Sequence, residues 1–78
     1  MSTVLLSSLR PGMDCRLLEL NLYGTMRRRL QELGFLPGAP LRCAFLAPSG
    51  SPMAVVCKGT MIALRRDVCD KLQVKLNV

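Results

Sequence analysis

The second half of the chain, residues 40–76, alternates between apolar and other side chains in short runs separated by turn signals. A period of two is typical of β-strands, in which successive side chains point to opposite faces. Between the runs, the PSGSP segment at Pro48–Pro52 predicts a turn, and Gly59–Thr60 predicts a tight hairpin. The side chains expected to face the core are Leu41, Cys43, Phe45, Met53, Val55, Cys57, Ile62, Leu64, Leu72, Val74 and Leu76. This half of the chain therefore predicts a sheet.

The same alternation places an unusual set of side chains on the outer face of the predicted sheet. Ala44, Leu46, Ala54 and Val56 are all apolar, although the outer face of a small sheet usually meets water. Apolar side chains gathered on a surface often mark a contact site. We therefore expect Leu46 and Val56 to contact a partner.

The start of the chain predicts a turn and one further strand. LRPG at Leu9–Gly12 is typical of a turn, because proline fixes φ and glycine relaxes it. Met13–Leu22 then predicts a strand with imperfect alternation, since Leu17 and Leu18 are adjacent. A β-bulge accommodates one extra residue of this kind.

One helix is predicted after this strand, over Thr25–Leu33. Met26, Leu30 and Leu33 fall on one helical face, and Thr25 is suited to the N-cap position. Gly34 suits the left-handed position after the helix, and Pro37 prevents the helix from restarting. We expect Phe35 and Leu36 to fold back onto the apolar face.

The chain has only 78 residues, which is enough for a single domain spanning 1–78. With two phenylalanines and one tyrosine, the core must consist of Leu, Val, Ile, Met and Cys. Closing the sheet would remove bare edges that so small a domain covers poorly. We predict a mainly-β fold: a small closed or half-closed β-barrel of about five strands with one inserted α-helix. Asp67 is expected to cap a short helical turn over residues 67–70.

The cysteines and the absence of histidine restrict the chemistry. Cys15, Cys43, Cys57 and Cys69 are far apart in the sequence, and we expect them to be buried, reduced thiols. Without histidine, a Cys/His zinc site is excluded and only a four-cysteine site from scattered positions remains. Histidine-dependent catalysis is excluded as well, and no phosphate loop or nucleophile elbow occurs. We predict a protein that is not an enzyme, with no catalytic, cofactor or metal residues.

No apolar run approaches the roughly 18 residues that span a bilayer. The first residues, MSTVLLSS, lack the basic region and the long apolar region of a secretion signal. We therefore expect a cytoplasmic protein without membrane insertion.

Three consecutive arginines, Arg27, Arg28 and Arg29, stand at the start of the predicted helix in a chain of net charge +6. They are either a solvated helix face or a docking surface, and cations at a helix N-terminus oppose its dipole. A contact with a partner would explain why the sequence has three arginines at a position where they destabilise the helix. Nucleic acid or another polyanion is the alternative ligand, although only Tyr23 lies nearby to stack on bases. The predicted partner-contact residues are Arg27, Arg28, Arg29, Leu36, Leu46 and Val56.

Several sequence blocks occur together in one order: LRPG, MRRRLQELGFLPGAPL, APSGSPMAVVCKG and IALRRDVCDKLQV. In this order the chain resembles FeoA-type proteins, small accessories of bacterial ferrous-iron uptake, over about residues 9–76. The most specific piece is R-x-L-x-x-L-G-F-x-P-G. The resemblance implies an SH3-like barrel.

The resemblance also implies a partner, the membrane permease FeoB with its cytosolic G-protein domain. It implies regulation of ferrous-iron uptake by docking, and it leaves open a homo-oligomer. Any weak Fe²⁺ binding is implied by the family alone, because the acidic residues show no shared ligand spacing.

Overall fold

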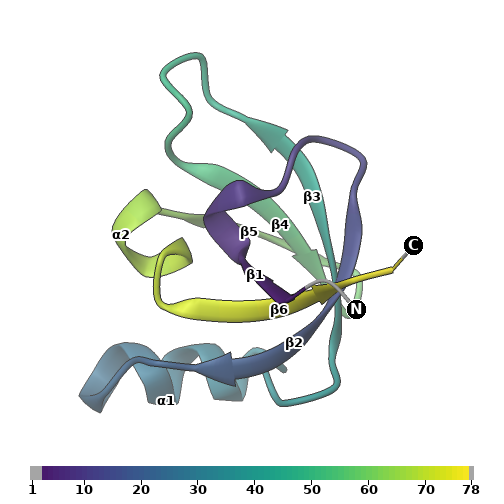
Figure 1. Ribbon diagram of the computed structural model, residues 1–78. Coiled ribbons are helices and arrows are strands. Elements are labelled where there is room, and N and C mark those ends of the chain that lie inside the picture. Colours follow the sequence, from purple (N-terminus) through teal and green to yellow (C-terminus); the bar gives the residue numbers. More distant parts are fainter. Residues whose placement is uncertain (1–2, 78) are drawn as a thin grey trace.

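The computed structural model describes residues 3–77. Its strands are β1 (Thr3–Leu5), β2 (Asp14–Leu20), β3 (Pro40–Leu46), β4 (Met53–Cys57), β5 (Thr60–Leu64) and β6 (Leu72–Leu76) (Figure 1). Its helices are α1 (Gly24–Glu32), α2 (Arg66–Cys69) and a single 3-10 turn, Leu6–Ser8. The predicted mainly-β fold with one inserted helix is confirmed. The sheet has one strand more than expected, since β1 lies before the first element that the sequence predicts.

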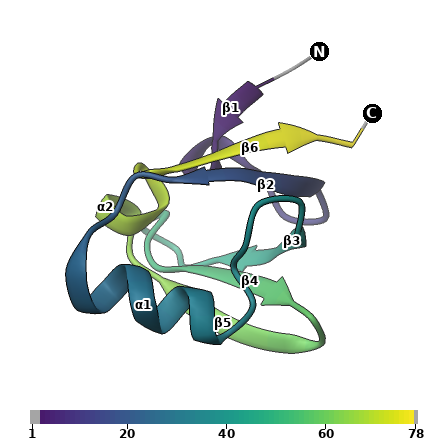
Figure 2. The same ribbon diagram turned by 90° about the horizontal axis from the view of Figure 1, so that it is seen from below.

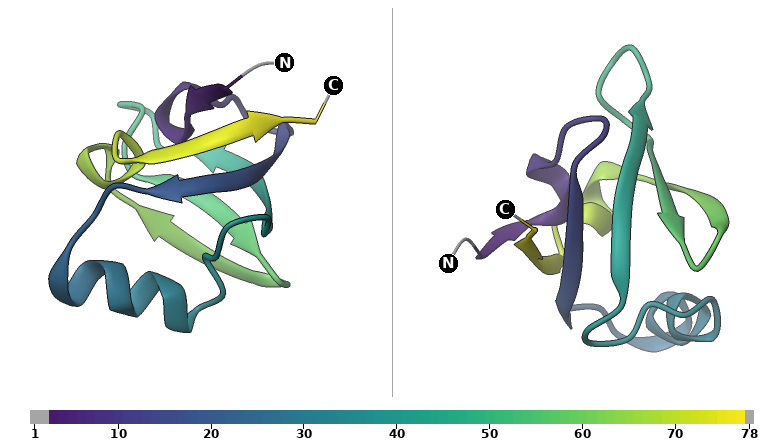
Figure 3. Two further views of the ribbon diagram at one scale, coloured as in Figure 1. Left: turned by 60° about the horizontal axis from the view of Figure 1, so that its bottom comes forward. Right: turned by 90° about the vertical axis from the view of Figure 1, so that its right-hand side faces the viewer.

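The strands form one six-stranded antiparallel sheet in the order β1-β6-β2-β3-β4-β5. The sheet curls, so that β1, β6 and β2 lie on one side and β3, β4 and β5 on the other (Figure 2). The barrel is half-closed, because β1 and β5 are both edge strands. α1 follows β2 and lies beside β5 at one end of the barrel (Figure 3).

The predicted bulge in β2 is confirmed. The pairing with β6 passes from Leu17↔Val74 to Glu19↔Gln73, so Leu18 is the extra residue. Leu17 is therefore buried, whereas Leu18 is 41% exposed. Two adjacent leucines thus face opposite ways.

A second bulge, in β3, was not expected. The pairing with β4 passes from Cys43↔Val55 to Phe45↔Ala54, which shifts the alternation by one residue. Phe45 is consequently 55% exposed, and Leu46 packs against the core. The prediction that Phe45 points inward and Leu46 outward was wrong for this reason.

The other residues of the predicted apolar outer face are also less exposed than expected. Ala54 is buried, while Ala44 and Val56 are half-buried. The most exposed large apolar side chains of the sheet are elsewhere, at Phe45 and at Met61, which is 57% exposed.

α1 begins one residue earlier than predicted, with Tyr23 at the N-cap and no side-chain cap. Thr25 already lies within the first turn, so the prediction that it caps the helix was wrong. Leu30 is buried, but Met26 and Leu33 are nearly 40% exposed, so the apolar face only partly joins the core.

The end of α1 agrees with the prediction. Gly34 has φ +105, and the Phe35 N–H donates to the Leu30 carbonyl at 2.9 Å. A Cβ atom at Gly34 would come within 2.8 Å of the Lys58 side chain, which is exposed and flexible and can move aside, so it is the positive φ that favours glycine here. Phe35 is fully buried as expected, whereas Leu36 is 46% exposed and does not fold back.

The turn between β4 and β5 and the start of α2 each differ slightly from the sequence prediction. The hairpin turn between β4 and β5 is Lys58–Gly59, because Thr60 already pairs with Cys57. The N-cap of α2 is Arg65 rather than Asp67. Asp67 lies in the first turn, where its carboxylate accepts the Val68 N–H at 3.1 Å.

Candidate functional site

The four cysteines lie in the core as buried free thiols, as predicted. Loss of hydration raises the pKa of Cys15 and of Cys69 to about 11 and also raises the pKa values of Cys43 and Cys57. Thiols bind metals and attack electrophiles as thiolates, which burial disfavours here. Within residues 3–77, no group of three or more His, Cys, Asp or Glu side chains could hold a metal ion. These donors therefore do not fit a metal site.

A groove opens between α1 and the strand β5. We call it the α1–β5 groove; its volume is about 280 Å³, and it is lined by Met26, Arg29, Leu30, Leu33, Ile62, Ala63, Leu64, Arg65 and Val68. The half-exposed Met26 and Leu33 lie on its helical side. Its walls are thus mostly apolar, and two arginines supply its charge.

Those two arginines are accessible. Arg29 projects from α1, Arg65 follows β5 directly, and both are exposed. In the part of the chain that the structure describes, neither forms an ion pair with an acidic side chain. The groove therefore combines apolar walls with unneutralised positive charge.

Arg27 differs from its two neighbours. Its guanidinium donates to the Leu20 carbonyl and, at 3.4 Å, to the Leu22 carbonyl. Arg27 is half-buried, whereas Arg28 and Arg29 are exposed. Arg27 thus joins the start of α1 to the end of β2, and the other two arginines of the triplet face solvent.

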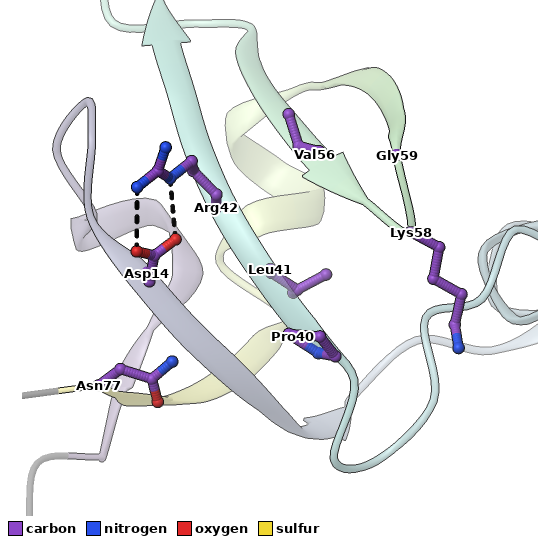
Figure 4. A pocket seen from close by; sticks show the side chains of 8 residues that line it. All are labelled: Asp14, Pro40, Leu41, Arg42, Val56, Lys58, Gly59 and Asn77. Atoms are coloured by element: carbon purple, nitrogen blue, oxygen red, sulfur yellow. Dashed lines mark hydrogen bonds and ion pairs between the residues drawn. The ribbon is translucent and has the colours of Figure 1, made fainter.

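A second depression lies across β2, β3 and the β4–β5 turn. This β2–β3 hollow has a volume of about 430 Å³ and is lined by Asp14, Pro40, Leu41, Arg42, Val56, Lys58, Gly59 and Asn77 (Figure 4). Arg42 binds Asp14 through Nε at 2.9 Å and through a terminal nitrogen at 3.1 Å. These hydrogen bonds lower the pKa of Asp14 and raise that of Arg42. Lys58 points away from this pair (Figure 4).

The predicted contact residues do not gather at one place. Arg29 lines the groove, Arg28 is exposed nearby on α1, and Leu36 is exposed in the loop after α1. Val56 lines the β2–β3 hollow, and Leu46 packs against the core.

Sequence reasoning missed Arg65 and the exposed side chain of Met61. Because Ile62 and Leu64 were predicted to face the core, the alternation of the strand also placed Met61 on the outer face. Its exposure could therefore have been predicted from the sequence. Arg65 gave no such signal, because only the folded chain brings it to α1.

The family model of the FeoA domain matches residues 4–76. The chain belongs to the FeoA family. Among solved structures, FeoA from Chlorobium tepidum is 31% identical to this chain with a TM-score of 0.91. The alignment covers 96% of this chain and 71% of the Chlorobium tepidum chain. Iron(II) transport protein A from Clostridium thermocellum is 30% identical with a TM-score of 0.88. The alignment covers 94% of this chain and 45% of the Clostridium thermocellum chain.

A third relative shows the fold class. FeoA from Stenotrophomonas maltophilia, solved in complex with zinc and described as a prokaryotic SH3 domain protein, is 29% identical with a TM-score of 0.79. The alignment covers 92% of this chain and 89% of that one. The SH3-like fold implied by the FeoA resemblance is therefore confirmed.

The comparison with curated proteins gave no match. None of the helices within residues 3–77 has the length and apolar character that crossing a membrane requires.

Proposed function

We propose that this FeoA protein is an accessory of bacterial ferrous-iron uptake that docks on the cytosolic part of a FeoB-type permease. One observation carries the proposal: nearly the whole chain matches the FeoA family, and a relative in it is described as an iron(II) transport protein. The Stenotrophomonas maltophilia relative is described as a candidate activating factor of ferrous-iron transport. In this proposal the protein acts in the cytoplasm by binding and carries out no chemistry, in keeping with its buried, protonated thiols.

The proposed contact includes the exposed part of α1 and the loop after it. Arg28 and Arg29 offer charge there, and Leu36 offers an apolar side chain. Arg27 contributes indirectly, because it fixes the start of α1 to β2. Val56 stays a prediction for a second area of contact, at the β2–β3 hollow. Leu46 also stays a prediction, but it packs against the core and does not line that hollow.

Affinity for the purified cytosolic region of the permease tests the docking. The double variant Arg28→Gln and Arg29→Gln should weaken binding at least tenfold, since exposed charge at an interface steers and orients the partner. Arg10→Gln with Lys75→Gln removes the same charge elsewhere and should change affinity less than twofold. Equal affinity for all three proteins would remove the arginines from the site. No binding of the wild type would overturn the proposal.

Transport provides the second measurement. Uptake of labelled ferrous iron should change when this protein is deleted from cells that carry the permease, and the wild-type protein should restore it. Uptake that does not depend on the protein would contradict an accessory role.

A polyanion remains the rival ligand, and one observation favours it. Tyr23 is 88% exposed immediately before α1, next to the arginines, where it could stack on a base. Nucleic-acid binding of this kind falls steeply as salt concentration rises. Retention on a heparin column and a steep salt dependence, without affinity for the permease, would select the rival.

A further inference from the structure

The outer edge of β5 forms one wall of the α1–β5 groove. β5 is the last strand in the sheet order, so only β4 pairs with it within residues 3–77. An edge strand presents a row of N–H and C=O groups that can pair with another extended chain. Here that row opens beside an apolar groove.

The hairpin geometry identifies the available backbone groups. Lys58 and Gly59 both have positive φ values, +50 and +80, as expected for a two-residue hairpin turn. The closing pair Cys57↔Thr60 is then hydrogen-bonded, and bonded and non-bonded pairs alternate from there. By this alternation Ile62 and Leu64 bond to β4, while the N–H and C=O groups of Met61 and Ala63 point away from it. Outside the hairpin, no described backbone group bonds to them.

β5 also lacks most of the features that usually protect an edge. Protected edges are short, charged, bulged, interrupted by proline, or covered by a helix or loop. α1 lies beside β5, but the open α1–β5 groove separates the two elements. β5 has five residues, TMIAL, with no charge and no proline, and its register with β4 is unbroken. The other edge strand, β1, has only three residues.

We propose that β5 accepts an extended segment of the partner protein as a seventh strand. Alternate apolar side chains of that segment enter the α1–β5 groove beside Leu33 and Ile62, and an acidic side chain binds Arg29 or Arg65. This inference rests on the proposed docking function and names the form of the contact. Backbone pairing supplies affinity, and the groove and its arginines supply specificity.

Charge selects an acidic partner segment over a second copy of this chain. The chain carries net charge +6, and β5 itself has no acidic residue. Antiparallel pairing of two β5 strands would place Arg65 of each copy near the Lys58–Gly59 turn of the other, and like charges across an interface oppose association. A segment with carboxylates instead neutralises Arg29 and Arg65.

The test combines a backbone variant with hydrogen exchange in the full-length protein. Ala63→Pro removes the outward N–H of an edge position and no bond to β4, and proline is tolerated at such positions. Ala63→Thr keeps the N–H and is the matched control. The probe is the purified cytosolic region of the permease, and the readouts are its Kd and the exchange rates of the Met61 and Ala63 amides.

Strand addition predicts that the probe slows exchange of both amides at least tenfold in the wild type. It also predicts that Ala63→Pro weakens binding at least tenfold, while Ala63→Thr stays within threefold. Binding without amide protection would overturn strand addition and leave docking intact. This outcome is measured on the wild-type protein, so it does not depend on whether a variant folds. Failure of the probe to bind the wild type overturns both. Concentration-dependent dimerisation that protects the two amides without the probe would identify a second copy as the occupant and overturn the choice of partner.

Discussion

In the sheet, β6, β2, β3 and β4 are hydrogen-bonded to a neighbour on each side, whereas α1 is attached by a few side chains and by the loop after it. Leu30 is the buried residue of α1, and Arg27 binds backbone carbonyl groups at the end of β2. Elements with few buried contacts open at a lower free energy than central strands. The α1–β5 groove lies along this boundary between the weakly attached helix and the sheet.

The largest effect is expected where α1 meets the core. Leu30→Ala should lower the free energy of unfolding by about 2 to 5 kcal/mol, because it leaves a cavity at the main anchor of the helix. Denaturant unfolding followed by circular dichroism measures this change. Leu36→Ala, at a 46% exposed position, is the control and should cost no more than about 0.5 kcal/mol. A small effect of Leu30→Ala would show that the helix is anchored in some other way.

The barrel core should respond to alkaline pH. Cys15 and Cys69 have pKa values of about 11 in the folded protein, above the ordinary value of 9.0. Folded molecules therefore keep protons that unfolded chains release above pH 9, and raising the pH favours unfolding. Between pH 9 and 10, each thiol should lower the free energy of unfolding by about 1 kcal/mol.

Denaturant unfolding at a series of pH values checks this loss. Cys69→Ala removes one of the thiols with a raised pKa, so between pH 9 and 10 the variant should lose about 1 kcal/mol less of its free energy of unfolding than the wild type. Other groups titrate equally in both proteins and cancel in the difference. An identical slope in the two proteins would contradict the assignment of the effect to buried thiols.

A smaller effect should distinguish the first two arginines of the triplet. Arg27→Gln loses hydrogen bonds to two carbonyl groups and should lower the free energy of unfolding by about 1 kcal/mol. Hydrogen exchange in α1 should accelerate with it, while the strands change little. Arg28→Gln removes an exposed cation that opposes the helix dipole, so stability should stay the same or rise slightly. Equal losses in both variants would mean that Arg27 is no special anchor.

Local signals were enough to predict much of this fold. The adjacent Leu17 and Leu18 required a bulge, and Gly34 marked the end of the helix, as the structure has it. The bulge in β3 could not be predicted in the same way. Ala44, Phe45 and Leu46 are all apolar, so only the pairing with β4 decides which of them faces the core.

The candidate groove was hidden from the sequence for a related reason. It joins residues 26–33, in α1 and its C-cap, to residues 62–68, and only folding brings these segments together. Charge predicted the exposure of Arg28 and Arg29 correctly. The hydrogen bonds of Arg27 to carbonyl groups at and after the end of β2 could not be predicted. The three arginines are consecutive and identical, so the sequence does not distinguish Arg27 from the other two.

The smallest effect is expected at the ion pair in the β2–β3 hollow, on the surface of the well-bonded sheet. Arg42 holds the pKa of Asp14 below its ordinary value of 3.8, mainly by hydrogen bonding. The pair therefore stabilises the fold above that value, and its contribution disappears as the pH falls through the lowered pKa. Both side chains are about half exposed, so water and salt screen the attraction. Arg42→Gln should return the pKa of Asp14 toward its ordinary value in an NMR titration while the unfolding midpoint at neutral pH barely moves. A clear loss of stability at neutral pH would mean that this exposed pair anchors the sheet as firmly as Leu30 anchors α1, and the contrast between barrel and helix would then fail.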